Sequence, residues 1–189
     1  MNVLEFGSYL AAPLLGKYLS DIGYNVTRVL RPSDSGGKKE EDEFLRPFDY
    51  DLNLRKKVID LDLPRENIKL INILKSTDIV IENFGNRVSQ KRGFDFESCI
   101  KINPNIIYIS LPGYCREDSE YSNTKAWDAI IMASSGVFCD MGLNRKLLGI
   151  KASYSSLPLP SVYGSIFGFF VLLCVVRANR KGEYFEVPL

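Results

Sequence analysis

Residues 76–84 read Ser-Thr-Asp-Ile-Val-Ile-Glu-Asn-Phe, and this stretch decides the fold class. Its apolar centre is short and β-branched, which predicts a strand over 78–82. Short strand-like runs recur on both sides of it, at residues 3–6, 26–30, 57–61, 106–111 and 184–187. Each of these runs predicts a further strand.

Helical patterns separate the predicted strands. Helices are predicted at residues 9–22, 65–76 and 161–176, and Gly23 is placed as the C-cap of the first. Residues 33–52 are polar, lack a periodic apolar face, and are expected to form an excursion. Strands that alternate with helices are the signature of right-handed βαβ units. The chain is therefore predicted to be α/β, with a mainly parallel sheet and flanking helices.

The predicted sheet also indicates where a ligand would lie. Ligands of parallel sheets bind beyond the carboxyl ends of the strands. In this sequence those ends are the segments after residues 6, 30, 82 and 111. The first of them, residues 7–13, lacks the G-x-G-x-x-G fingerprint, so no dinucleotide cofactor is expected.

The composition excludes several kinds of site. The 189 residues include no histidine, which removes Ser-His-Asp and Cys-His nucleophile systems and histidine-ligated metal sites. The four cysteines lie far apart, so we expect no metal site, no dense disulfide scaffold, and a reducing cytoplasmic location. The net charge of +1 argues against a nucleic-acid partner.

Two stretches bear on secretion and membranes. Glu5 interrupts the apolar start of the chain, which argues against a secretory signal. Residues 157–176 carry no charge and are followed by Arg177, Arg180 and Lys181, a pattern that would suit one membrane span. Because this stretch also contains prolines, glycines and hydroxyl side chains, we expect a buried core helix and no membrane partner.

Motifs along the whole chain, in order, resemble one protein family. They are Val3-Leu4-Glu5-Phe6 with Ala11-Ala12-Pro13, Leu52 to Lys57 with Asp60 to Leu63, residues 76–84, 93–97 and 103–108, Gly113-Tyr114, and Gly182-Glu183 before Phe185-Glu186-Val187. On these motifs the chain resembles the class III CoA-transferases. That family includes the formyl-CoA and carnitine CoA-transferases and the α-methylacyl-CoA racemases.

The resemblance implies a Rossmann-like large domain that acts on CoA or acyl-CoA thioesters, with no covalently bound cofactor. Members of the family transfer CoA between carboxylic acids or epimerise an acyl-CoA. They are about twice as long, with a small second domain and a returning C-terminal part that interlocks two subunits as a homodimer. The resemblance thus implies that residues 1–189 form one N-terminal large-domain fragment, without the second domain and the return.

The resemblance also implies a set of CoA-binding positions. They are Ala11, Arg31, Leu61, Asp62, Asn83, Phe84, Gly85, Lys91, Gly113 and Tyr114. Arg31 matches a position near the nucleotide phosphates, and a guanidinium suits bidentate phosphate contact. Lys91 occupies a position beside the adenine that is usually arginine.

Structural explanations stay open for several of these residues. They are a surface charge for Arg31, a turn or cap for Asn83, core packing for Phe84 and Tyr114, and a solvated helix end for Lys91 with Arg92. Glu82, at the end of its strand, is either a buried, paired carboxylate or an exposed one.

Two catalytic positions of the family are filled by other residues. Ser161 to Gly164 match the start of a family helix, but the preceding residue, a nucleophilic aspartate in the transferases, is Pro160. The racemase His-Asp pair reads Trp127-Asp128. No catalytic residue is therefore assigned, although Asp128 stays a candidate acid or base, with capping of residues 129–135 as the alternative.

These replacements leave two functions open. Without the nucleophile, acyl transfer loses its covalent intermediate, which predicts impaired catalysis in a family enzyme acting on CoA thioesters. The alternative is a non-catalytic CoA-binding remnant, or a partner subunit completed by another chain.

Overall fold

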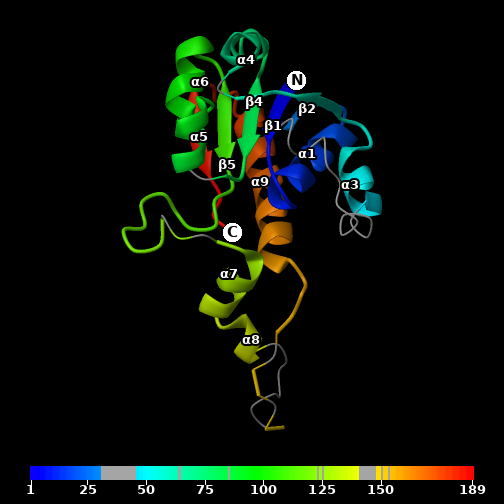
Figure 1. Cartoon of the computed structure of the whole chain (residues 1–189), viewed down its shortest axis with the longest axis vertical. Helices are drawn as coiled ribbons and strands as arrows, with labels where there is room; N and C mark the ends of the chain where they lie inside the picture. The colour runs from blue at the N-terminus through cyan, green and yellow to red at the C-terminus, as the bar shows by residue number, and fades with distance from the viewer. Residues whose placement is uncertain are drawn as a thin grey trace.

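The computed structural model describes residues 1–30, 46–63, 65–84, 86–122, 124, 126–140, 148–149, 151–152 and 154–189. Within these residues, six strands form one sheet in the order β3-β2-β1-β4-β5-β6, and every neighbouring pair is parallel (Figure 1). The strands are β1 Asn2–Phe6, β2 Asn25–Leu30, β3 Lys57–Asp60, β4 Ile79–Glu82, β5 Ile107–Ser110 and β6 Glu183–Glu186. This is the strand order of a Rossmann-like sheet, which confirms the predicted fold class.

Helices cover both faces of the sheet. They are α1 Ala11–Asp21, α3 Arg46–Asn53, α4 Asn67–Leu74, α5 Asn86–Arg92, α6 Phe96–Ile102, α7 Asp128–Ser134, α8 Val137–Asp140 and α9 Leu159–Arg177. Helices α1 and α9 supply one apolar cluster, and α4 and α6 supply the other. Figure 1 shows α9 running along the sheet, with α7 and α8 projecting beyond its carboxyl edge.

Strands β4 and β5 are buried at every residue because helices lie on both of their faces. Side chains of Ile79 and Ile81 join the α1–α9 cluster, whereas Val80 joins the α4–α6 cluster. The apolar centre of residues 76–84 thus supplies both cores at once. For this reason a short apolar run could indicate the fold class of the whole chain.

Helix α9 is buried on one side only. On the buried side Gly168 allows a close approach, because a Cβ there would lie 3.1 Å from Leu111 and 3.3 Å from Leu15. On the other side Phe167 and Phe170 expose 60% and 58% of their surface. By length and composition α9 could cross a membrane, and only a third of its apolar window is buried. The expected core helix is therefore half-buried.

The other predicted elements can be compared with the structure. All six predicted strands are present, the helices at 9–22, 65–76 and 161–176 correspond to α1, α4 and α9, and Gly23 has a positive φ of 91° after α1. The prediction that residues 33–52 form an irregular excursion is wrong for residues 46–52, which belong to helix α3. Residues 31–45 lie outside the described residues. Side-chain hydrogen bonds to Arg28 hold α3 in place, and an apolar periodicity does not reveal such bonds.

Candidate functional site

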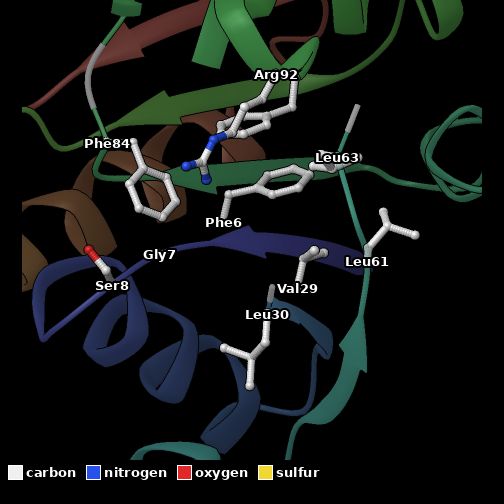
Figure 2. A pocket seen from close by; sticks show the side chains of 10 residues that line it. Phe6, Gly7, Ser8, Val29, Leu30, Leu61, Leu63, Phe84 and Arg92 are labelled. Atoms are coloured by element: carbon white, nitrogen blue, oxygen red, sulfur yellow. The ribbon is translucent and has the colours of Figure 1, made fainter. Parts of the chain in front are cut away.

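A cavity of about 280 Å³ opens at the carboxyl ends of β1 and β2 (Figure 2). Its lining residues are Phe6, Gly7, Ser8, Val29, Leu30, Leu61, Leu63, Phe84, Arg92 and Phe94. Four of the segments that follow or end strands contribute to it, namely those of β1, β2, β3 and β4. This is the edge of a parallel sheet at which ligands bind.

Aromatic rings form one wall of the cavity. The rings of Phe6 and Phe94 are stacked, with centroids 4.1 Å apart and planes 6° apart, and Phe84 lies tilted against Phe94 at 6.1 Å. Phe6 and Phe94 are buried, whereas Phe84 is half-buried at the opening. The stacked pair therefore supports the wall, and the Phe84 ring offers flat apolar surface to a ligand at the opening.

Arg92 supplies positive charge to the cavity. Its guanidinium carbon lies 5.4 Å from the centroid of the Phe84 ring, and Figure 2 shows the group reaching over the cavity toward Phe84 and Phe6. A guanidinium can stack on a ring and still offer its N–H groups to a phosphate. The combination suits a ligand that is aromatic and anionic.

Asn83 ties two of the turns together. Its side-chain oxygen accepts a hydrogen bond from the Ser8 N–H at 3.0 Å, and its side-chain nitrogen donates to the Ser8 carbonyl at 2.9 Å. The β1–α1 turn is thereby fixed against the β4–α5 turn. Next along the chain, Tyr9 has a φ of +60°, a left-handed conformation that is costly for a residue other than glycine.

Glu82, at the end of β4, holds the β4–α5 turn through hydrogen bonds. Its carboxylate accepts hydrogen bonds from the Phe84 N–H at 2.7 Å and from the Ser110 hydroxyl, and only 1% of the residue is exposed. Of the two alternatives, Glu82 is therefore buried and hydrogen-bonded. It fixes the backbone that carries the Phe84 ring.

A buried ionic cluster lies on the face of β1 and β2 opposite to the cavity, since Glu5 and Arg28 alternate with Phe6 and Val29 along their strands. The Lys56 ammonium donates to Glu5 at 2.7 Å and to the Pro13 carbonyl at 2.6 Å. Glu5 also lies 3.3 Å from the Arg28 Nε, and Arg28 donates to Asn53 at 2.8 Å. Burial raises the pKa of Glu5 and lowers that of Lys56, while each partner's charge opposes the shift of the other.

A second pocket, of about 130 Å³, lies at the start of α9. Its lining residues are Tyr9, Trp127, Asp128, Ala129, Met132, Tyr154, Ser155, Ser156, Leu157 and Pro158. The Asp128 carboxylate accepts hydrogen bonds from the N–H and the hydroxyl of Ser161, both at 2.7 Å. Asp128 therefore caps α9, whereas the proposed alternative had it capping its own helix, which begins at Asp128 itself.

A family model described as CoA-transferase family III matches residues 1–183. The chain belongs to this family. It is 31% identical, over 194 aligned residues, to the CoA-transferase/lyase DddD of Marinomonas sp., an alignment that covers 100% of this chain and 22% of DddD. It is 25% identical to the acetyl-CoA:oxalate CoA-transferase of Acetobacter aceti, over 99% of this chain and 49% of that protein.

Solved structures from two other bacteria share this fold. A hypothetical protein of Mycobacterium tuberculosis matches with a TM-score of 0.80 at 22% identity, over 100% of this chain and 54% of its own. A CaiB/BaiF family protein of Brucella suis matches with a TM-score of 0.74 at 22% identity, over 99% of this chain and 51% of its own. The chain spans a fifth to about half of the length of these relatives.

The predicted CoA positions of family III fall into three groups in this structure. Leu61 and Phe84 line the cavity, and Asn83 joins two of the turns that surround it. The residues that lie away from its lining are Ala11, which is fully buried, Asp62, Lys91, which is exposed, and Gly113 and Tyr114 after β5. Arg31 and Gly85 lie outside the described residues.

Three of the residues away from the lining have visible structural roles. The Ala11 carbonyl accepts a hydrogen bond from Ser165 at 2.8 Å. Gly113 packs so closely on Ala126 that an added Cβ would lie 1.7 Å from the alanine Cβ. Tyr114 is half-buried and packs against Tyr121, which exposes 42% of its surface, with ring centroids 5.4 Å apart, so this contact lies outside the two apolar clusters.

Eight of the ten cavity residues were not singled out from the sequence as contacts, and Arg92 is the charged one among them. The buried Ser89 lies three positions before it and therefore on the same face of α5, whereas Lys91 lies on another face and is exposed. The helical register of residues 86–92 would have distinguished the two basic residues. Among the described residues, no group of three or more cysteine, aspartate or glutamate side chains could hold a metal ion.

Proposed function

We propose that this chain binds the CoA portion of acyl-CoA thioesters in the cavity formed by β1, β2 and the turns after β3 and β4. The observation that supports this most directly is the Arg92 guanidinium held over the Phe84 ring at the cavity. CoA carries an adenine ring and phosphates, so it matches an aromatic wall with one arginine. Membership of family III supplies the substrate class.

We further propose that catalysis by the covalent route is impaired. The family resemblance places the nucleophilic aspartate where Pro160 stands, and proline has no group that can attack an acyl carbon. The carboxylate at the entrance of α9 comes from Asp128 in α7, and both of its oxygens accept hydrogen bonds from Ser161. These bonds support a capping role for Asp128.

Titration calorimetry with CoA tests the binding proposal. Wild-type protein is expected to bind CoA, and Arg92→Ala should weaken binding about tenfold, the effect of losing one charge-assisted contact. Lys91→Ala is the matched control, since it removes the neighbouring positive charge from an exposed position outside the cavity lining. Absence of CoA binding by the wild-type protein would overturn the proposal.

Turnover assays test the impaired chemistry. Wild-type protein is expected to leave acyl-CoA donors and carboxylic acid acceptors unchanged over hours, as judged by chromatography of the CoA species. A Pro160→Asp variant is expected to form an acyl-enzyme or CoA-enzyme adduct if the rest of the site is intact, which intact-mass spectrometry would detect. Robust turnover by the wild-type protein would contradict this part of the proposal.

A second candidate function is that of a partner subunit completed by another chain. The exposed side of α9 supports it, because Tyr163, Phe167 and Phe170 lie on one helical face and each exposes more than half of its surface. The chain spans 22% and 49% of the length of the two curated relatives named above. Sedimentation velocity of the chain, alone and mixed with the remaining half of a family member, distinguishes a stable monomer from a complex.

A further inference from the structure

The second pocket, at the start of α9, is walled by aromatic side chains around one carboxylate. Tyr9, Trp127 and Tyr154 line it and expose 58%, 63% and 70% of their surface, and Asp128 stands among them. Phe138 packs on Tyr154 from α8, with ring centroids 5.5 Å apart. Large aromatic side chains that line a pocket and face solvent offer surface for a ligand.

Tyr9 is held in this pocket at a conformational cost. Its left-handed backbone would favour glycine, yet a tyrosine occupies the position and exposes its ring. Both polar backbone atoms of the preceding Ser8 are fixed by Asn83, so the strain persists. The structure thus directs the Tyr9 side chain into the second pocket while Ser8 lines the CoA cavity.

The electrostatic character of the pocket is negative. None of the described residues that line it is a lysine or an arginine. The positive end of α9 amounts to about half a unit charge, which offsets only part of the Asp128 carboxylate. Burial and the nearby Asp128 both raise the pKa of Tyr9, burial being the larger cause, as expected beside a negative group.

We propose that this pocket holds the acyl end of the thioester and selects a compact acyl group that carries positive charge over one that carries a second carboxylate. The aromatic faces attract a cation, and the Asp128 carboxylate repels an anion for which the lining provides no counter-ion. The proposal rests on the proposed function, since the CoA cavity must hold the other end of the same molecule. The two pockets meet at adjacent residues, Ser8 and Tyr9.

Three thioesters with three-carbon acyl groups test this selectivity by calorimetry at low ionic strength. They are β-alanyl-CoA, which carries an ammonium, propionyl-CoA, which is neutral, and malonyl-CoA, which carries a carboxylate. We expect affinity to fall in that order, with about tenfold between the first and the last. Free CoA tests the proposed function separately. If free CoA does not bind, the assignment of the cavity to CoA is wrong. If free CoA binds but the three thioesters follow a different order of affinity, only the present inference is overturned.

Two variants locate the source of the selectivity. Asp128→Asn removes the charge but keeps an acceptor for Ser161, because asparagine caps helices about as well as aspartate. It should bring malonyl-CoA to within about twofold of propionyl-CoA while leaving CoA affinity unchanged. Trp127→Leu, at an exposed position, should remove most of the preference for β-alanyl-CoA over propionyl-CoA.

Each outcome decides the inference. Loss of charge selectivity in Asp128→Asn, with an unchanged melting temperature, supports the assignment to the second pocket. Unchanged selectivity in both variants overturns it, as does tighter binding of malonyl-CoA by the wild-type protein. If Asp128→Asn lowers the melting temperature, Trp127→Leu alone gives the answer, because its exposed side chain contributes little to the fold.

Discussion

The cavity that we assign to CoA and the pocket at the start of α9 differ in how they are built. The cavity is lined by a stacked pair of rings and bordered by a hydrogen-bonded turn, and a buried ionic cluster stabilises the opposite face of the same strands. The pocket is lined by exposed aromatic side chains, with Pro160 at the position of the family nucleophile. The contrast teaches that the cavity is built from contacts within the fold, whereas the pocket depends on side chains that stand exposed to solvent.

The largest expected effect concerns the buried ionic cluster on the face of the sheet opposite to the cavity. Lys56→Met leaves Glu5 buried without its ammonium partner, and we expect the free energy of unfolding to fall by about 3–5 kcal/mol. Urea denaturation followed by circular dichroism measures the loss. Lys57→Met, at an exposed position of β3, is the control and should change stability by less than about 0.5 kcal/mol. Equal effects in the two variants would show that the cluster does not stabilise the fold.

The next effect concerns the tie between the two turns. Asn83→Ala removes both hydrogen bonds to Ser8, at an expected cost of about 2 kcal/mol, and should also weaken CoA binding. Urea denaturation and calorimetry measure the two effects. Asn67→Ala, at the exposed start of α4, serves as the comparison. If the Asn83→Ala protein keeps its stability and its CoA affinity, the hydrogen bonds between Asn83 and Ser8 do not support the binding site.

A pH effect of intermediate size tests the apolar cluster under α4 and α6, to which Cys99 belongs. Burial raises the pKa of the Cys99 thiol to about 12, from an ordinary value of 9.0. Because the folded state resists deprotonation, stability is fully present below pH 9 and is lost as the pH rises from 9 toward 12. From this thiol alone, the free energy of unfolding at pH 10 should be about 1.4 kcal/mol lower than at pH 8. Urea denaturation at both values should show a smaller difference for Cys99→Ala.

The smallest expected effect lies on the exposed face of α9. Phe167→Ala should change the free energy of unfolding by less than about 0.5 kcal/mol, since the ring touches little of the fold. Leu172→Ala, on the buried face of the same helix, should cost about 2–5 kcal/mol in the same urea denaturation experiment. A large loss in Phe167→Ala would mean that another chain covers this face in solution.

The sequence predicted the sheet well because its strands are short apolar runs separated by clear helical patterns. It failed at α3, which buries Leu52 and accepts two hydrogen bonds from Arg28 through the side chains of Asp49 and Asn53. The family resemblance marked residues 52–57 as a motif but could not show that Lys56 pairs with Glu5, 51 positions away in the chain. Such pairings depend on the packing of β1, α1 and β3 in space.

The sequence predicted which segments of the chain surround the candidate site, but few of the individual residues that line it. The turns after β1 and β4 were expected to meet a ligand, and Phe84 and Leu61 do line the cavity. The choice between Lys91 and Arg92 required the rotation of α5, because neighbouring residues of a helix point about 100° apart. The capping of α9 by Asp128 joins residues 33 positions apart, which no local pattern encodes.

The tie between Asn83 and Ser8 has a consequence for protein engineering. Asn83 binds only the backbone N–H and carbonyl of Ser8, so the attachment does not depend on which side chain position 8 carries. A combinatorial library at positions 8 and 9 could therefore vary one side chain in each pocket while the turn keeps its anchor. Selection of such a library for new thioester ligands would change the side chains that line the two pockets while the backbone of the turn keeps its position.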